Sequence, residues 1–147
     1  MPISGFDHVA IPAEQLEAML RFYKALGFGV LNEDEWRAGR HPAVSVVFGD
    51  NKINFHAPEL WRDNPRFTLR GPAALPGCGD FCFVWDGSVD DAAAAIRSAG
   101  TDVIEGPVAR VGGRRRGSTE GTSVYTRDPD GNLLEFIVYP ANSPATT

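Results

Sequence analysis

Two stretches of this sequence match each other and decide the fold that it predicts. The first is Gly5-Phe6-Asp7-His8-Val9-Ala10-Ile11, and the second is Gly79-Asp80-Phe81-Cys82-Phe83-Val84. Both are short runs rich in aromatic and β-branched residues, as strands are. A helical stretch that ends at a glycine, Gly27 or Gly100, follows each of them at nearly the same distance. A repeat of this kind predicts two copies of one βαβββ unit.

The predicted fold is therefore α+β, with two pseudo-symmetric βαβββ modules whose curved mixed sheets enclose a shared cavity. We expect one domain over residues 1–147, with module one at about 5–58 and module two at about 79–140. The proline-rich stretch 57–78 should be an irregular linker without helix or strand. The tail 141–147 should be flexible.

Hydrophobic periodicity and turn residues place the elements within each module. The first module should have strands at 6–11, 29–33, 43–48 and 52–56 and a helix at 14–26. The second should open with its strand at 79–84 and continue with a helix at 89–99 and strands near 102–105, 122–126 and 133–139. The linker 57–78 and the loops at 34–42 and 112–121 should shape the mouth of a binding pocket.

Composition narrows the class of protein. The chain has 147 residues and a formal net charge of -5, which disfavours nucleic acid as a partner. Its one basic run, Arg114-Arg115-Arg116, is a solvated loop or a clamp for an anionic substrate. No apolar run reaches the roughly 20 residues of a membrane span, and the N-terminus does not resemble a signal peptide, so we expect a cytoplasmic protein. Cys78 and Cys82 are too widely spaced for a redox or zinc-ribbon motif.

Strand parity groups the polar residues that could form a site. Because side chains alternate between the faces of a strand, His8, His56, Asp80 and Glu135 can all face one cavity if the two modules pair pseudo-symmetrically. Two imidazoles and one carboxylate with open positions suit Fe(II), Mn(II), Co(II), Ni(II) or Zn(II). Taken singly, each residue also has an ordinary interpretation: His8 as a hydrogen-bonded core histidine, His56 as a loop residue, and Glu135 on an edge strand facing water.

The sequence resembles the vicinal oxygen chelate superfamily, which includes glyoxalase I, extradiol dioxygenases, methylmalonyl-CoA epimerase, and fosfomycin and bleomycin resistance proteins. The resemblance spans residues 5–139 and is carried by three segments: Phe6-Asp7-His8-Val9-Ala10-Ile11, Arg21-Phe22-Tyr23-Lys24-Ala25-Leu26-Gly27-Phe28, and Arg127-Asp128-Pro129-Asp130-Gly131-Asn132-Leu133-Leu134-Glu135-Phe136. The stretch 48–56 is similar to a subgroup of small virulence-associated, glyoxalase-like proteins.

The resemblance implies a metal site and a homodimer. Its metal ligands would come from the first and last strands of each module, which gives His8, His56 and Glu135 for one divalent ion. Fe(II) is favoured, and Ni(II), Zn(II) or Mn(II) are alternatives. Asp80, where many relatives have histidine, would be a fourth ligand, an outer partner or a base. Asn54 is the repeat equivalent of Glu135.

Three functions are compatible with this site. The leading hypothesis is a dioxygenase-like enzyme that acts on a small, oxygen-chelating substrate. The alternative is a glyoxalase-type lyase or isomerase in which Glu135 or Asp80 moves a proton between neighbouring carbons. Tyr125 is a candidate acid or base in either case, or a cross-strand packing residue. The third function is a drug- or metabolite-binding resistance protein without catalysis.

Overall fold

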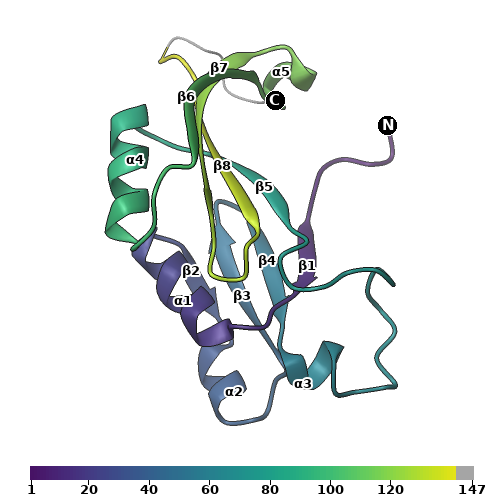
Figure 1. Ribbon diagram of the computed structural model, residues 1–147. Helices are drawn as coiled ribbons and strands as arrows, with labels where there is room; N and C mark the ends of the chain where they lie inside the picture. The colour runs from purple at the N-terminus through teal and green to yellow at the C-terminus, as the bar shows by residue number, and fades with distance from the viewer. Residues whose placement is uncertain (142–147) are drawn as a thin grey trace. The chain divides into compact units, whose positions relative to one another are not determined.

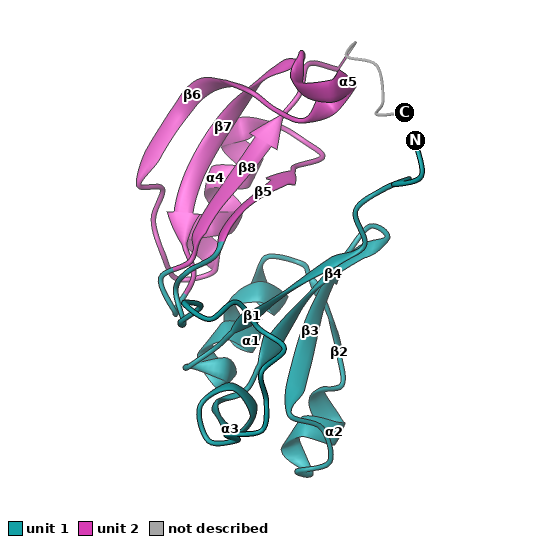
Figure 2. Ribbon diagram, turned by 90° about the vertical axis from the view of Figure 1, so that its right-hand side faces the viewer, with its two compact units in different colours: residues 1–79, 129–131 teal, residues 80–128, 132–147 magenta. Residues whose placement is uncertain are grey.

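The structure, a computed structural model, describes residues 1–141 and divides them into two compact units (Figure 2). Unit 1 contains Met1–Gly79 and Pro129–Gly131, and unit 2 contains Asp80–Asp128 and the residues after Gly131. The flexibility predicted for the tail concerns residues that, from 142 onward, lie outside the described part of the chain. No helix of residues 1–141 is both long and apolar enough to cross a membrane.

The two units repeat one topology, which confirms the predicted α+β fold with two modules (Figure 1). Unit 1 consists of β1 (His8–Pro12), α1 (Leu16–Ala25), β2 (Gly29–Leu31), α2 (Glu33–Arg37), β3 (Ala43–Phe48), β4 (Asn51–His56) and α3 (Pro58–Trp61). Unit 2 consists of β5 (Asp80–Val84), α4 (Val89–Ser98), β6 (Glu105–Val111), α5 (Arg114–Gly117), β7 (Glu120–Arg127) and β8 (Leu133–Val138). The strand orders are β1-β4-β3-β2 and β5-β8-β7-β6, with the first pair of each sheet parallel and the other pairs antiparallel.

In unit 1 the apolar residues of one sheet face and of α1 form the core. Ile53 and Phe55 of β4 are buried, whereas the intervening Asn54 is only half-buried. The ring centroid of Tyr23 on α1 lies 5.3 Å from that of Phe55 and 5.1 Å from that of Phe28. Truncating a fully buried aromatic side chain costs about 3–5 kcal/mol, so this packing dictates which face of the sheet turns inward.

Unit 2 has the same arrangement around α4, which packs on β7 and β8. Ile96 of α4 and Leu134 and Phe136 of β8 are buried. The helix begins with a capping box, in which Ser88 accepts a hydrogen bond from the Asp91 backbone and the Asp91 carboxylate accepts one from the Ser88 backbone. We call the opposite side of the sheet, which carries Glu135, the open face of unit 2.

The structure differs from the sequence prediction at several segments. The strand expected at 29–33 ends at Leu31, and α2 occupies part of the expected loop because Glu33 and Arg37 form an i,i+4 ion pair. The linker contains α3, whose first helical residue is Pro58, a favourable position for proline. Instead of a strand at 102–105, the structure has β6 at Glu105–Val111. Pairing with β7 decides where this strand forms.

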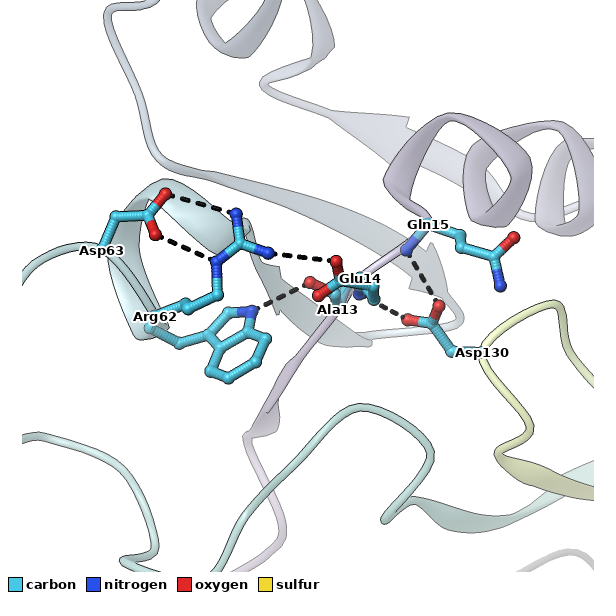
Figure 3. A network of polar contacts seen from close by, with 7 residues as sticks. Ala13, Glu14, Gln15, Arg62, Asp63 and Asp130 are labelled. Carbon is cyan, nitrogen blue, oxygen red and sulfur yellow. Dashed lines mark hydrogen bonds and ion pairs between the residues drawn. The ribbon is translucent and has the colours of Figure 1, made fainter.

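A carboxylate distant in sequence satisfies the backbone at the start of α1 (Figure 3). The two carboxylate oxygens of Asp130 accept hydrogen bonds from the backbone N–H groups of Glu14 and Gln15, each at 2.9 Å. A negative charge at this end also favours the helix dipole. In the same network, Arg62 pairs with Glu14 at 3.1 Å and with Asp63 at 2.9 Å.

Hydrogen bonds between Asp128 and Asn132 close the turn that contains Asp130. The carboxylate of Asp128 accepts hydrogen bonds from the backbone and the side-chain amide of Asn132, at 2.9 and 2.7 Å. The Asp128 backbone N–H donates in return to the Asn132 carbonyl at 3.1 Å. Both residues are buried. The aspartate-proline-aspartate-glycine-asparagine motif is therefore explained by hydrogen bonds within the turn and to the backbone before α1.

Replacing Asp130 with alanine should lower the free energy of unfolding by about 1 kcal/mol, because two backbone donors beside the helix start lose a charged acceptor. Chemical denaturation would measure the change. Asp50→Ala, at an exposed turn position, is the control and should be nearly neutral. Equal effects of the two substitutions would contradict the role given to Asp130.

Candidate functional site

The centre of the open face of unit 2 is the carboxylate of Glu135. It is half-buried in the middle of β8, opposite Cys82 on one neighbouring strand and Tyr125 on the other. The fully buried Ser123 donates a hydrogen bond to Glu135 Oε2 at 2.6 Å. This donor holds the carboxylate in one orientation.

Tyr125 lies beside Glu135 and is held by an arginine. Arg110 Nε donates to the Tyr125 hydroxyl at 3.0 Å, and its Cζ lies 5.6 Å from the ring centroid. Burial raises the pKa of Tyr125, and the Glu135 carboxylate adds to that rise, whereas Arg110 opposes it. Tyr125 is therefore a protonated phenol at neutral pH, able to donate its O–H. We call Cys82, Arg110, Ser123, Tyr125 and Glu135 the Glu135 cluster.

Cys82 completes the cluster as a neutral thiol. Although the residue is exposed overall, partial burial of its thiol and then the Glu135 carboxylate raise its pKa to about 12. A thiolate is the nucleophilic form of cysteine. Cys82 is therefore a poor nucleophile at neutral pH.

Asp80 occupies the open face two positions before Cys82. It is the first residue of β5, is exposed, and lies opposite Leu133. Asp80 and Glu135 are thus diagonal neighbours on adjacent strands. Such neighbours have Cα atoms about 7–8 Å apart, so both carboxylates are within reach of one small ligand or ion.

In unit 1, His8 is oriented by the residue before it. Its Nδ1 lies 2.5 Å from Asp7 Oδ1, and about 44% of its side chain is exposed. We assign the proton to Nδ1 because the carboxylate can only accept, which leaves Nε2 with a free lone pair. A carboxylate on the second ring nitrogen is common for histidines that bind metals.

His56 lies at the other end of the same strand pair. Along the parallel strands His8 is opposite Lys52 and His56 is opposite Pro12. The histidines are thus four positions apart, roughly 13 Å at about 3.3 Å per residue. Two imidazole nitrogens on one tetrahedral ion lie roughly 3.3 Å apart, and side chains stand nearly perpendicular to a sheet. The register therefore argues against His8 and His56 as ligands of one ion.

The surroundings of His56 are those of a packed side chain. It is half-buried, and its ring packs edge-on against Phe67 with centroids 5.2 Å apart. Burial lowers its pKa, so it is neutral at physiological pH. This favours the interpretation of His56 as a structural residue.

Asn54, and not His56, is the β4 residue that lies diagonally next to His8 in the strand register. It lies opposite Ala10, so it is the diagonal neighbour of His8, as Glu135 is of Asp80. Its Oδ1 accepts a hydrogen bond from Ser45 Oγ at 2.6 Å. Each unit therefore places one polar pair at the same positions of its first and last strands.

Each pair has donor types that a divalent ion accepts, namely imidazole and carboxamide in unit 1 and two carboxylates in unit 2. Imidazole, carboxamide and carboxylate donors suit Zn(II), Ni(II), Mn(II) or Fe(II). Within residues 1–141, neither unit by itself gathers three His, Cys, Asp or Glu side chains that could hold a metal ion. The metal site stays a prediction.

Comparison with known proteins decides the family. The model of the Glyoxalase/Bleomycin resistance protein/Dioxygenase superfamily matches residues 5–136. The chain belongs to this superfamily. It is 33% identical to virulence protein STM3117 of Salmonella typhimurium strain LT2, over 95% of this chain and 87% of that protein. It is 31% identical to the glyoxalase domain-containing protein RDO1 of Mycosarcoma maydis, over 95% and 70% of the two chains.

Solved structures of the superfamily match the fold as well. The crystal structure of STM3117 is similar with a TM-score of 0.75, covering 95% of this chain and all of that one, at 32% identity. The integron cassette protein VCH_CASS1 from the mobile metagenome of V. Cholerae gives 0.76, covering 95% and 98% of the two chains, also at 32% identity.

The sequence interpretation missed two members of the Glu135 cluster. Arg110 was missed because β6 was placed too early, so Arg110 fell outside any expected strand. Ser123 shares its strand face with Tyr125, and that parity was the one signal that could have found it. Their roles depend on strand register, which one sequence does not specify.

Two cavities lie away from these residues. One, of about 650 Å³, is in unit 2, where Trp85, Arg114 and Tyr139 contribute to its wall. The other, of about 400 Å³, is in unit 1 and includes Trp36 and His41. Among the described residues, neither wall contains Glu135, Asp80, Tyr125, His8 or His56, whereas Arg114 of the predicted anion clamp lines the cavity of unit 2.

We expect the exposed Cys78 to be alkylated by iodoacetamide before Cys82 at pH 8. A thiol with a pKa of about 12 should react at least about 10-fold more slowly than an ordinary thiol. The substitution Glu135→Gln removes one cause of the raised pKa and should accelerate alkylation of Cys82 alone. Peptide mass spectrometry over time measures both rates, and an unchanged Cys82 rate would contradict the contact with Glu135.

Ser123→Ala should destabilise the protein more than Ser45→Ala. Both serines are buried and donate at 2.6 Å, but Ser123 donates to a carboxylate and Ser45 to an amide oxygen. Hydrogen bonds to charged groups contribute about 1.5–3 kcal/mol and neutral ones about 1 kcal/mol. Denaturation of the two variants gives the comparison. Equal losses would mean that Glu135 does not accept this hydrogen bond as a carboxylate.

Proposed function

We propose that this chain is a metal-dependent enzyme that transfers a proton on a small substrate with neighbouring oxygen atoms, as a lyase or isomerase does. The observation that supports this choice is the β1–β4 register. The dioxygenase hypothesis depended on two histidines and one carboxylate around iron. Because His8 and His56 lie at opposite ends of their strand pair, that ligand pattern loses its support.

Glu135 is the proposed base. Ser123 holds one of its oxygens, so the carboxylate can accept a proton from a carbon beside a carbonyl group and return it to the neighbouring carbon. Tyr125 stays a phenol because its pKa is raised, and it donates a hydrogen bond to a substrate oxygen. Asp80 lies on the same face and is the second candidate for the base.

The proposed ligands of the ion are His8, through Nε2, and Glu135, with Asn54 and Asp80 as further oxygen donors. A bound divalent cation would act as a Lewis acid on the substrate oxygens. The orientation of His8 by Asp7 and the matching diagonal pairs of the two strand repeats support this set.

Binding without catalysis is the second candidate. The chain shares its fold with TnmS3, an antibiotic-binding protein from Streptomyces sp. CB03234, at 20% identity and a TM-score of 0.66. It also shares its fold with lactoylglutathione lyase from Agrobacterium tumefaciens, at 22% identity and a TM-score of 0.64. Fold similarity at this level fits either function.

Metal content tests the ligand set. The purified protein is incubated anaerobically with Fe(II), Ni(II), Zn(II) and Mn(II), and bound metal is measured by mass spectrometry. We expect about one ion per chain, lost in His8→Ala and in Glu135→Gln but retained in His56→Ala. Loss in His56→Ala with retention in Asn54→Ala would restore the ligand set that includes both histidines.

Proton exchange tests the chemistry. The metal-loaded protein is incubated in D2O with a panel of 2-hydroxycarbonyl compounds, and loss of the C–H signal is followed by NMR. Glu135→Gln, which removes both the proposed base and an ion ligand, should slow the exchange by at least about 100-fold, while His56→Gln should not. If the loaded protein binds compounds of the panel but exchanges none of their protons, the binding function is correct instead.

A further inference from the structure

In unit 2, the loop of residues 112–117, which we call the arginine loop, contacts Tyr139. The backbone N–H of Arg114 donates to the Tyr139 hydroxyl at 3.3 Å. A Cβ atom at Gly112 would collide with that hydroxyl, so only glycine allows this approach. The loop therefore has a defined position over the end of β8.

The same loop adopts a conformation that its residues disfavour. Arg115 and Arg116 both have left-handed backbones, with φ of 53° and 59°. Hydrogen bonds compensate for this: Gly117 N–H donates to the Gly113 carbonyl at 3.1 Å, and Ser118 Oγ donates to the Arg115 carbonyl at 2.8 Å. Strained backbone that is held by its surroundings is typical of functional loops.

The guanidinium of Arg114 is oriented but lacks an anion. Its Cζ lies 4.1 Å from the centroid of the Tyr139 ring, which covers one face of the group. Within residues 1–141 its Nε is buried without a hydrogen-bond partner, and no carboxylate forms an ion pair with Arg114. Stacking of this kind leaves the edge of the guanidinium to pair with an anion.

Arg114 lines the cavity of about 650 Å³ in unit 2. The rest of the wall includes Trp85 and Tyr139 with the aliphatic residues Val84 and Val138. The Trp85 indole Nε1 is likewise buried without a partner among the described residues. Asp86 is a negative charge in the same wall. One cation, one anion and apolar sides favour a ligand with a single carboxylate on an apolar body, because a second negative group would meet Asp86.

We propose that this cavity binds a small aromatic monocarboxylate, with its carboxylate paired to Arg114 and its ring against Trp85 and Val84. The binding site is independent of the proton-transfer reaction proposed above, because it shares no residue with the Glu135 cluster. Bidentate pairing with a stacked guanidinium provides the affinity for a carboxylate, and the apolar wall provides the preference for an aromatic body.

Benzoate titration of the full chain tests the proposal. Binding is followed by NMR at the Trp85 indole N–H, with benzamide as the uncharged analogue and inorganic phosphate as the competing anion. We expect benzoate to shift this signal and benzamide and phosphate not to. Equal shifts by benzoate and phosphate, or no shift by benzoate at millimolar concentration, would overturn the proposal.

Variants with matched charge assign the site. Arg114→Gln should weaken benzoate binding about 10-fold or more, because a charge-assisted pair is lost. Arg116→Gln removes the same charge from the same loop and should change binding by less than about twofold. Asp86→Asn should tighten binding, and this result does not depend on the folding of the Arg114 variant. Equal weakening by the two arginine variants, or unchanged binding in Asp86→Asn, would contradict the assignment.

Discussion

Each unit depends on one constraint: a strand that buries one face against a helix must present its alternate residues on the other face. In β4, Ile53 and Phe55 pack in the core, so Asn54 is turned the other way. In β8, Leu134 and Phe136 have the same effect on Glu135. The burial of aromatic and aliphatic side chains thus decides where the polar candidates of the site are presented.

The second constraint is local and polar. In the turn before β8, Asp128 and Asn132 bond to each other while buried, and Asp130 accepts from the backbone before α1. An unpaired buried polar group costs about 1–3 kcal/mol. Removing one partner of these hydrogen bonds would therefore lower the stability of the fold. The aspartate-proline-aspartate-glycine-asparagine motif, which is part of one of the segments that resemble the family, is thus explained by the geometry of a turn. The proposed chemistry uses Glu135, three residues after that motif ends.

The Glu135 cluster shows how ordinary residues acquire a role through register. Ser123 and Arg110 carry no motif, yet one orients the carboxylate and the other holds Tyr125. Cys82 demonstrates the reverse: a thiol loses nucleophilicity because partial burial and a neighbouring carboxylate raise its pKa. In unit 1 the same geometry gives Asn54 the position beside His8 and leaves His56 packed against Phe67.

The sequence by itself determined the two-module α+β fold, the main strands and helices, and the face to which His8, Asn54 and Glu135 belong. It could do so because alternation and helical periodicity are local properties of the chain. Only the tertiary structure decided that β6 lies at 105–111, that His56 is four positions from His8, and that Arg114 stacks on Tyr139 beside a cavity. The reason is physical: strand register and side-chain stacking are decided by contacts between residues far apart in sequence. Local sequence patterns do not specify those contacts.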